Sequence, residues 1–277
     1  MSNKKRVGYL SIFFVLGIMV FICFGCNKPM TTESKKTRMK ELLKDKYGEE
    51  FEVRELYDTG RIEAWCYPVR DLTLVFEADA YSSMDELAED DYVQAIVEKQ
   101  LDEELQPSAE EAFGNCFVST NIALGETKGI VFSVAENITF DTLLEYEKKE
   151  GLSNTIYINV FIESTGKDES MIEKEYEFIR KIGSFMHRYG LRDSVLILYW
   201  GDSHFINDAK KAIEEFGWSR SASGFSNREN ITKIKEGKKR LRIYYKDDIP
   251  IDDSLESSNY DEMDFNKYKE LKEEVLR

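Results

Sequence analysis

Histidine is scarce in this chain, with His187 and His204 the two examples among 277 residues. Histidine is the side chain that titrates near neutral pH and the commonest protein ligand of metals, so a site built from several histidines is excluded. His187 stands beside Arg188 near the end of a predicted long helix. That position is typical of a surface or boundary side chain rather than a catalytic one.

His204 belongs to the stretch Gly201-Asp202-Ser203-His204, which follows an apolar run over residues 194–200. Sites of many α/β proteins lie after such a strand. Consecutive Asp, Ser and His side chains cannot converge on one another as a catalytic triad requires. We expect Asp202 or Ser203 to cap the next helix by accepting its free amides, and a ligand-binding helix start is the alternative.

Linear catalytic motifs are also missing: there is no G-x-S-x-G, H-E-x-x-H, Walker or G-x-G-x-x-G pattern. The stretch from Asp85 to Glu111 carries eleven acidic residues and one lysine, but no Ca²⁺-binding loop pattern. The solvated face of an amphipathic helix explains such a stretch. The sequence therefore predicts neither a metal site nor a cofactor, and an enzymatic activity is not favoured.

Positive charge is in deficit, with 38 Lys and Arg against 53 Asp and Glu and a net charge of −15. A chain of this charge repels nucleic acid and anionic lipid surfaces at long range. A nucleic-acid function is therefore excluded.

The N-terminus has the features of an export signal. Lys4, Lys5 and Arg6 precede an uncharged run from Val7 to Gly25, and the run ends at Cys26. The apolar run partitions into a bilayer while the cations keep its start in the cytoplasm, which places the rest of the chain on the outer side.

The pair Gly25-Cys26 after this short apolar run resembles the signal of bacterial lipoproteins. The resemblance implies that Cys26 is lipidated, that residues 1–25 are removed, and that a palmitate-containing lipid anchor holds the protein on the extracytoplasmic face of the cell membrane. Cys23 and Phe24 depart from the usual pattern of Leu and a small residue. The 19 uncharged residues are also long enough to span a bilayer as an uncleaved helix, which is the alternative.

Cysteine is otherwise rare, because only Cys66 and Cys116 lie outside the signal. Both occur in strand-like surroundings on the oxidising side of the membrane, so a disulfide between them is one interpretation. Two buried free thiols on neighbouring strands are the other.

The rest of the chain alternates between helical and strand periodicity, and its 17 Phe and 15 Tyr indicate packed structure. We predict an α+β fold of mixed, largely antiparallel sheets with packed helices, in one large domain or two small ones. The expected helices cover about 33–47, 84–112 with a stop at Pro107, a short stretch from 139, 170–189, 202–217 and 265–275. The expected strands cover 51–57, 61–69, 72–78, 116–123, 130–134, 155–163 and 194–200.

The pattern divides the chain into five segments. They are the signal 1–25, a polar tether 26–36, an α+β unit 37–136, an α/β unit 137–246 and an acidic C-terminal tail 247–277 with a short helix.

A basic segment stands out near the C-terminus. Ile231–Lys235 and Lys238–Lys246 flank Glu236-Gly237 and predict a β-hairpin. Its cations could contact an anionic ligand, or the acidic tail could fold over them and neutralise them; we favour the second because the segments are adjacent and opposite in charge. The candidate ligand contacts are Lys233, Lys235, Lys238, Lys239, Arg240 and Arg242.

These features favour a membrane-anchored, non-enzymatic protein of the cell envelope that acts by binding or scaffolding. Its expected partners are the membrane through the lipid anchor, and another envelope protein or an anionic envelope polymer. The alternative is an envelope hydrolase that uses dispersed carboxylates, which no linear motif would reveal.

Overall fold

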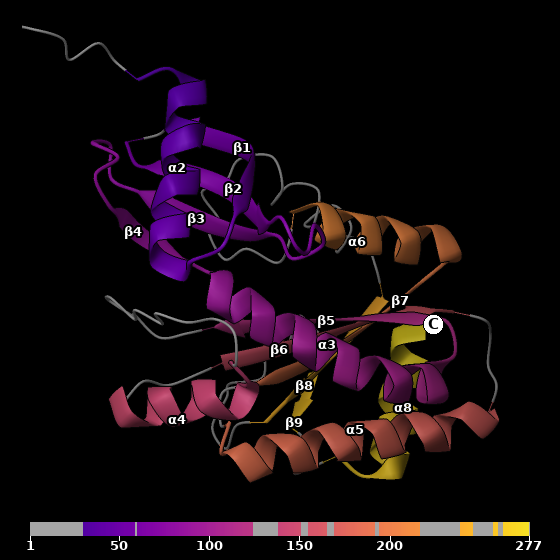
Figure 1. Cartoon of the computed structure of the whole chain (residues 1–277). Coiled ribbons are helices and arrows are strands. Elements are labelled where there is room, and N and C mark those ends of the chain that lie inside the picture. Colours follow the sequence, from indigo (N-terminus) through magenta and orange to yellow (C-terminus); the bar gives the residue numbers. More distant parts are fainter. Residues whose placement is uncertain are drawn as a thin grey trace, which may run out of the picture.

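The protein has an α+β architecture with two sheets, as the sequence predicts (Figure 1). The computed structural model describes residues 30–58, 60–123, 138–150, 155–164, 169–191, 194–216, 239–245, 257–259 and 263–276. The first sheet has four antiparallel strands, and the second has five strands of mixed direction.

The small sheet is formed by β1 (Phe51–Asp58), β2 (Ile62–Pro68), β3 (Phe76–Ala80) and β4 (Leu87–Asp90). Helix α2 (Thr32–Tyr47) packs on one of its faces and buries Met39, Leu42 and Leu43 there. The helix begins where the Thr31 hydroxyl accepts a hydrogen bond from the Ser34 amide, and it ends at Gly48 with φ +76°. The strand prediction found β1 and β2 and placed β3 too early. It missed β4, which it had included in the acidic helix.

Helix α3 (Tyr92–Phe113) joins the two sheets (Figure 1). Tyr92 and Ala95 belong to the core under the small sheet, whereas Val97, Leu101 and Leu105 belong to the core under the large sheet. The predicted stop at Pro107 is wrong, because the helix continues to Phe113 with Ala109 and Ala112 buried. Packing of this last turn outweighs the missing proline N–H.

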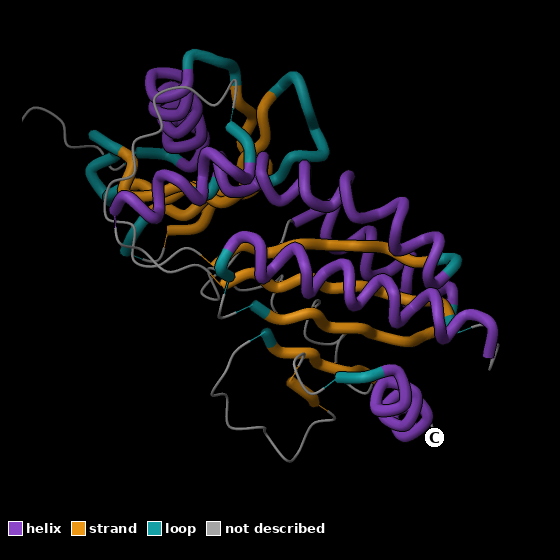
Figure 2. The backbone as a smooth tube through the Cα atoms, turned by 90° about the horizontal axis from the view of Figure 1, so that it is seen from below, coloured by secondary structure: helices purple, strands orange, loops and turns teal. Residues whose placement is uncertain are grey.

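The large sheet follows the order β5 (Cys116–Ala123), β6 (Thr155–Glu163), β7 (Val195–Gly201), β8 (Lys239–Tyr244) and β9 (Ser257–Asn259). The pairs β6–β7 and β8–β9 are parallel, and the other neighbours are antiparallel. The helices around it are α4 (Phe140–Glu150), α5 (Glu169–Tyr189), α6 (Ser203–Phe216) and α8 (Phe265–Leu276). Figure 2 shows the strands side by side, with α8 ending at the label C.

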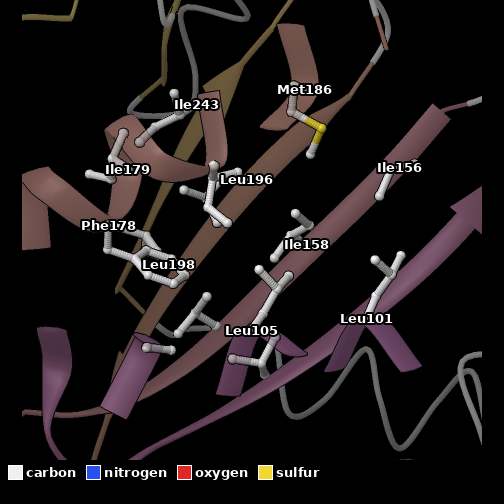
Figure 3. Close-up of a cluster of buried hydrophobic side chains, with 14 of the residues drawn as sticks. Leu101, Leu105, Ile156, Ile158, Phe178, Ile179, Met186, Leu196, Leu198 and Ile243 are labelled. Carbon is white, nitrogen blue, oxygen red and sulfur yellow. The ribbon is translucent and has the colours of Figure 1, made fainter. Parts of the chain in front are cut away.

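The two faces of the large sheet are covered by different helices. Side chains of α3, α5 and α8 meet one face, and Figure 3 shows Leu101, Ile179 and Met186 among the strand residues of this core. Helix α6 covers the other face through Phe205, Ile206 and Ala209.

The predicted boundary at residues 136 and 137 does not coincide with the division between the cores. Strand β5, which the prediction assigned to the first unit, pairs with β6 of the large sheet. The other strand predicted before this boundary, 130–134, lies outside the described residues. The division falls within α3 instead.

Candidate functional site on the small sheet

The predicted lipidation site, Cys26, lies outside the described residues, as does the signal. Within the described part of the chain, no helix is both long and apolar enough to cross a membrane. Lipid anchoring therefore stays a prediction.

Cys66 and Cys116 are free thiols, so the disulfide interpretation is wrong. Cys66 lies on β2 in the core of the small sheet, and Cys116 lies on β5 in the core of the large one. The two strands belong to different sheets and are not neighbours, so only the buried-thiol part of the alternative is correct. Burial raises the pKa of the Cys116 thiol to about 12 and that of Cys66 well above its ordinary value.

Of the six predicted anion contacts, the three that the structure describes do not all lie on one face of the sheet. Lys233, Lys235, Lys238 and the first arm of the predicted hairpin lie outside the described residues. Lys239, Arg240 and Arg242 lie on β8, which pairs with β7 on one side and β9 on the other. Successive strand residues point to opposite faces, and the Lys239 Nζ donates to the Leu276 carbonyl at the end of α8.

The last helix of the acidic tail, α8, packs through apolar side chains. Tyr268, Leu271 and Val275 of α8 are buried against the core of the large sheet. Glu175 of α5 accepts hydrogen bonds from the Tyr268 hydroxyl at 2.7 Å and from the Lys272 Nζ at 2.6 Å. Among the described residues, α8 is thus held by burial, by this pair with α5 and by the contact of Lys239 with its last turn. Most of the residues whose charges would compensate one another, 231–238 and 247–256, lie outside the described residues, so charge compensation between tail and hairpin stays a prediction.

Both histidines are exposed, His187 on α5 and His204 on α6. The Asp202 Oδ1 accepts a hydrogen bond from the Phe205 amide at 2.8 Å, which confirms the predicted helix cap. Its carboxylate occupies the place where an anionic ligand would bind at the start of α6, so this feature argues against a ligand-binding helix start.

The most unusual polar cluster lies on the small sheet. Register places Glu63 of β2 opposite Asp79 of β3, and Asp79 opposite Glu89 of β4. In the next row, Trp65 is opposite Glu77. We call Glu63, Glu77, Asp79 and Glu89 the acidic face.

The acidic face is the side of the sheet that α2 leaves uncovered. Ile62, Ala64 and Ala78 pack with α2, and strand alternation turns the residues between them the other way. Glu63, Glu77 and Asp79 are nevertheless only 8%, 6% and 7% exposed.

Asp79 is the centre of this face. Its Oδ1 is buried and has no hydrogen-bond partner, and its Oδ2 lies 4.0 Å from the Arg61 Nη1. Burial, then the negative charges of Glu63 and Glu89, raise the pKa of Asp79 to about 7, against an opposing effect of Arg61. This carboxyl group therefore exchanges its proton near neutral pH.

This arrangement can attract a cation or transfer a proton. In the described part of the chain, no group of three or more His, Cys, Asp or Glu side chains is placed to hold a metal ion. A positively charged organic group is the better match, since it needs fewer converging oxygen atoms than Ca²⁺.

Sequence reasoning missed this face. Its signal was the alternation in Phe76-Glu77-Ala78-Asp79-Ala80, where two acids fall on one side of a short strand. The prediction of that strand ended at residue 78, so Asp79 was left out of it.

Comparisons with known proteins show a shared fold. No family model matches the chain, and no curated protein matches it. A DUF5037 family protein of known crystal structure from Ruminococcus gnavus superimposes with a TM-score of 0.59 at 20% sequence identity. The match covers 86% of this chain and 98% of that protein, so it includes both sheets rather than one of them. At this identity the similarity concerns the fold alone.

Proposed function

We propose that this protein is an envelope-binding protein, lipid-anchored on the extracytoplasmic side of the membrane, whose acidic face recognises a positively charged ligand. The observation that carries the proposal is the buried Asp79 Oδ1, which has no hydrogen-bond partner and lies among carboxylates of three adjacent strands. The anchor part of the proposal is supported by the lipoprotein-like signal ending at Cys26.

A cationic ligand would relieve an unfavourable arrangement. Burying a carboxylate is costly, neighbouring carboxylates repel one another, and the Arg61 Nη1 compensates Asp79 only from a distance of 4.0 Å. A ligand cation beside Asp79 and Glu89 would offset both effects in the bound state. The protein would thereby gain affinity from groups that reduce its stability when the site is empty.

Binding is tested by calorimetric titration of full-length protein in detergent with a short peptide of Lys, Arg and Gly at physiological ionic strength. The variants are Asp79→Asn, Glu89→Gln and the matched control Glu41→Gln. The control also removes one negative charge, from an exposed position on α2. We expect both variants of the acidic face to bind more weakly than wild type, and the control to bind equally. Absence of binding, or equal loss in all three variants, would contradict the proposal.

The anchor is tested by the intact mass of protein extracted from membranes. We expect loss of residues 1–25 and a diacylglycerol adduct on Cys26. A full-length, unmodified chain would instead establish the uncleaved helix.

A carboxylate-dependent envelope hydrolase is the second candidate. It is favoured by the opposition of Glu63 and Asp79 across β2 and β3 and by the pKa of about 7 at Asp79, which suits proton transfer. Assay of cell-wall glycan with wild type, Glu63→Gln and Asp79→Asn distinguishes the candidates. Turnover that both substitutions abolish would support the hydrolase over the binding protein.

A further inference from the structure

Two arginines of β8 lie side by side on one face of the large sheet. Leu241, between them in sequence, belongs to the core on the face opposite α6, so strand alternation turns Arg240 and Arg242 toward the α6 side. Register sets Arg240 opposite Tyr199 of β7 and Arg242 opposite Ile197. Both β7 residues belong to the core under α6, which packs over β5, β6 and β7. We call Arg240 and Arg242 the arginine pair.

The charge of the arginine pair is not compensated by a carboxylate. Both side chains are partly exposed, and within the described part of the chain neither guanidinium forms an ion pair or a hydrogen bond. The Arg242 Nε is itself buried and has no hydrogen-bond partner. Buried donors are nearly always paired, and a bound ion is one of the groups that satisfies them. The unpaired Nε therefore indicates an acceptor that comes from outside the chain.

Both guanidiniums act on one phenol group. Burial raises the pKa of Tyr199 to about 12, and the positive charges of Arg242 and Arg240 oppose this rise. The Phe161 ring stacks on the Tyr199 ring, with centroids 5.0 Å apart and 9° between the planes. The arginine pair thus converges beside a ring that packing holds in place.

We infer that the arginine pair binds a phosphate group of a ligand outside this chain. The inference goes beyond the proposed function, because it assigns a second ligand, of opposite charge, to the other sheet. It uses no residue of the acidic face.

The geometry and charge favour phosphate over carboxylate. Two strand residues extend about 6.6 Å, a separation that two long side chains can close to meet on one anion. Each guanidinium presents a planar fork of N–H donors. A carboxylate has two oxygens, which a single fork can occupy, whereas a phosphate group has oxygens for both forks. A phosphomonoester also carries a charge of about −1.5 to −2 at pH 7, close to the sum of two guanidiniums.

The experiment is calorimetric titration of full-length protein in uncharged detergent with inorganic phosphate, dimethyl phosphate or acetate. The variants are Arg240→Ala, Arg240→Lys and Arg242→Met, which keeps an apolar side chain in place of the arginine stem. Lys44→Ala is the matched control, since it removes one exposed cation from α2.

We expect Arg240→Ala and Arg242→Met to bind inorganic phosphate about ten- to hundredfold more weakly than wild type, the range of a charge-assisted hydrogen bond. Arg240→Lys should lose less affinity than Arg240→Ala, because it keeps the charge without the fork. Lys44→Ala should bind as wild type does, and acetate should bind more weakly than phosphate. A preference for dimethyl phosphate would support a phosphodiester, as in a polymer or lipid headgroup, and a preference for inorganic phosphate would support a terminal or free phosphate.

The Tm without ligand separates binding from a structural role. Removing a half-buried cation that has no partner should leave the Tm of Arg242→Met equal to or above that of wild type. A lowered Tm with unchanged phosphate affinity would make Arg242 a structural residue and overturn the inference. Equal loss of affinity in Lys44→Ala would overturn it too, as would equal binding of acetate and phosphate. Absence of binding of both phosphate probes to wild type would do the same, and would leave the proposed cation site untouched.

Discussion

The Asp102 carboxylate of α3 accepts a hydrogen bond from the Thr120 backbone amide of β5 at 2.5 Å. Glu98 and Gln106 do the same for the amides of Ile122 and Val118, at 2.7 and 2.9 Å. Four residues of a helix rise about 6 Å along its axis, and two residues of a strand extend about 6.6 Å. Side chains at every fourth residue of α3 can therefore reach the backbone amides of every second residue of β5. Because β5 is the outer strand of the large sheet, α3 closes an edge that would otherwise be open to pairing.

The first prediction concerns the pH dependence of stability. Burial raises the pKa values of Glu98 and Asp102 to about 8, above the value near 4 of an unfolded carboxyl. The folded state therefore binds more protons than the unfolded state. The contribution of these two groups to the free energy of unfolding is fully present below about pH 4 and is lost as pH rises through about 8. We expect Asp102→Asn, which keeps the acceptor oxygen, to exceed wild type above about pH 8 by on the order of 1–2 kcal/mol in urea denaturation.

Asp102→Ala separates the charge from the hydrogen bond. This variant leaves the Thr120 amide without its acceptor, and we expect it to be about 1–3 kcal/mol less stable than Asp102→Asn at every pH. If the Asn and Ala variants had the same stability, the hydrogen bond to Thr120 would not matter for the closed edge.

The second prediction concerns the affinity of the acidic face for cations. The pKa of Asp79 is raised to about 7, and a bound cation favours its charged form. Affinity for the short peptide of Lys, Arg and Gly should therefore rise as pH increases through about 7, by up to about tenfold between about pH 6 and about pH 8. Calorimetry of wild type and Asp79→Asn checks this, and a pH dependence that survives in Asp79→Asn would assign it to another group.

The third prediction concerns the attachment of α8. Glu175 is 4% exposed and accepts hydrogen bonds from Lys272 and Tyr268. Lys272→Ala leaves this buried carboxylate without its charge partner, and we expect a loss of about 3 kcal/mol with faster hydrogen exchange in α8. Glu175→Gln combined with Lys272→Met should recover much of the stability. Failure of the pair to do so would mean that the buried carboxylate left without its partner does not account for the loss in Lys272→Ala.

The fourth prediction concerns the thiols. Cys66 and Cys116 are buried, and burial raises the pKa of each, which keeps both in the unreactive protonated form. Peptide mapping after iodoacetamide treatment should find neither residue alkylated in the folded protein and both alkylated in urea. A disulfide-linked peptide from unreduced protein would contradict the assignment to separate cores.

Much of the second half of the fold follows from local pattern. The apolar run of β6 and the helical spacing of α5 predict these elements within one residue at each end. A strand buried on both faces gives a continuous apolar run, and a helix buried on one side gives apolar residues at helical spacing, so both can be recognised from the order of residues. The Asp202 cap is equally local, since donor and acceptor lie three residues apart. The end of α3 was not predictable in this way: Pro107 indicates a break in the helix, and the packing of Ala109 and Ala112 against distant segments outweighs it.

The candidate site shows the same contrast. The sequence by itself determined which strand residues alternate between apolar and acidic, and that an apolar segment ends at Cys26. Only the tertiary structure decided that Glu63, Asp79 and Glu89 share one row, because their opposition depends on the register of three strands separated along the chain. It likewise decided that Glu98 and Asp102, which look like a solvated helix face, lie against the edge of β5. A carboxylate acquires a raised pKa from what surrounds it, and those surroundings come from segments far away in the sequence.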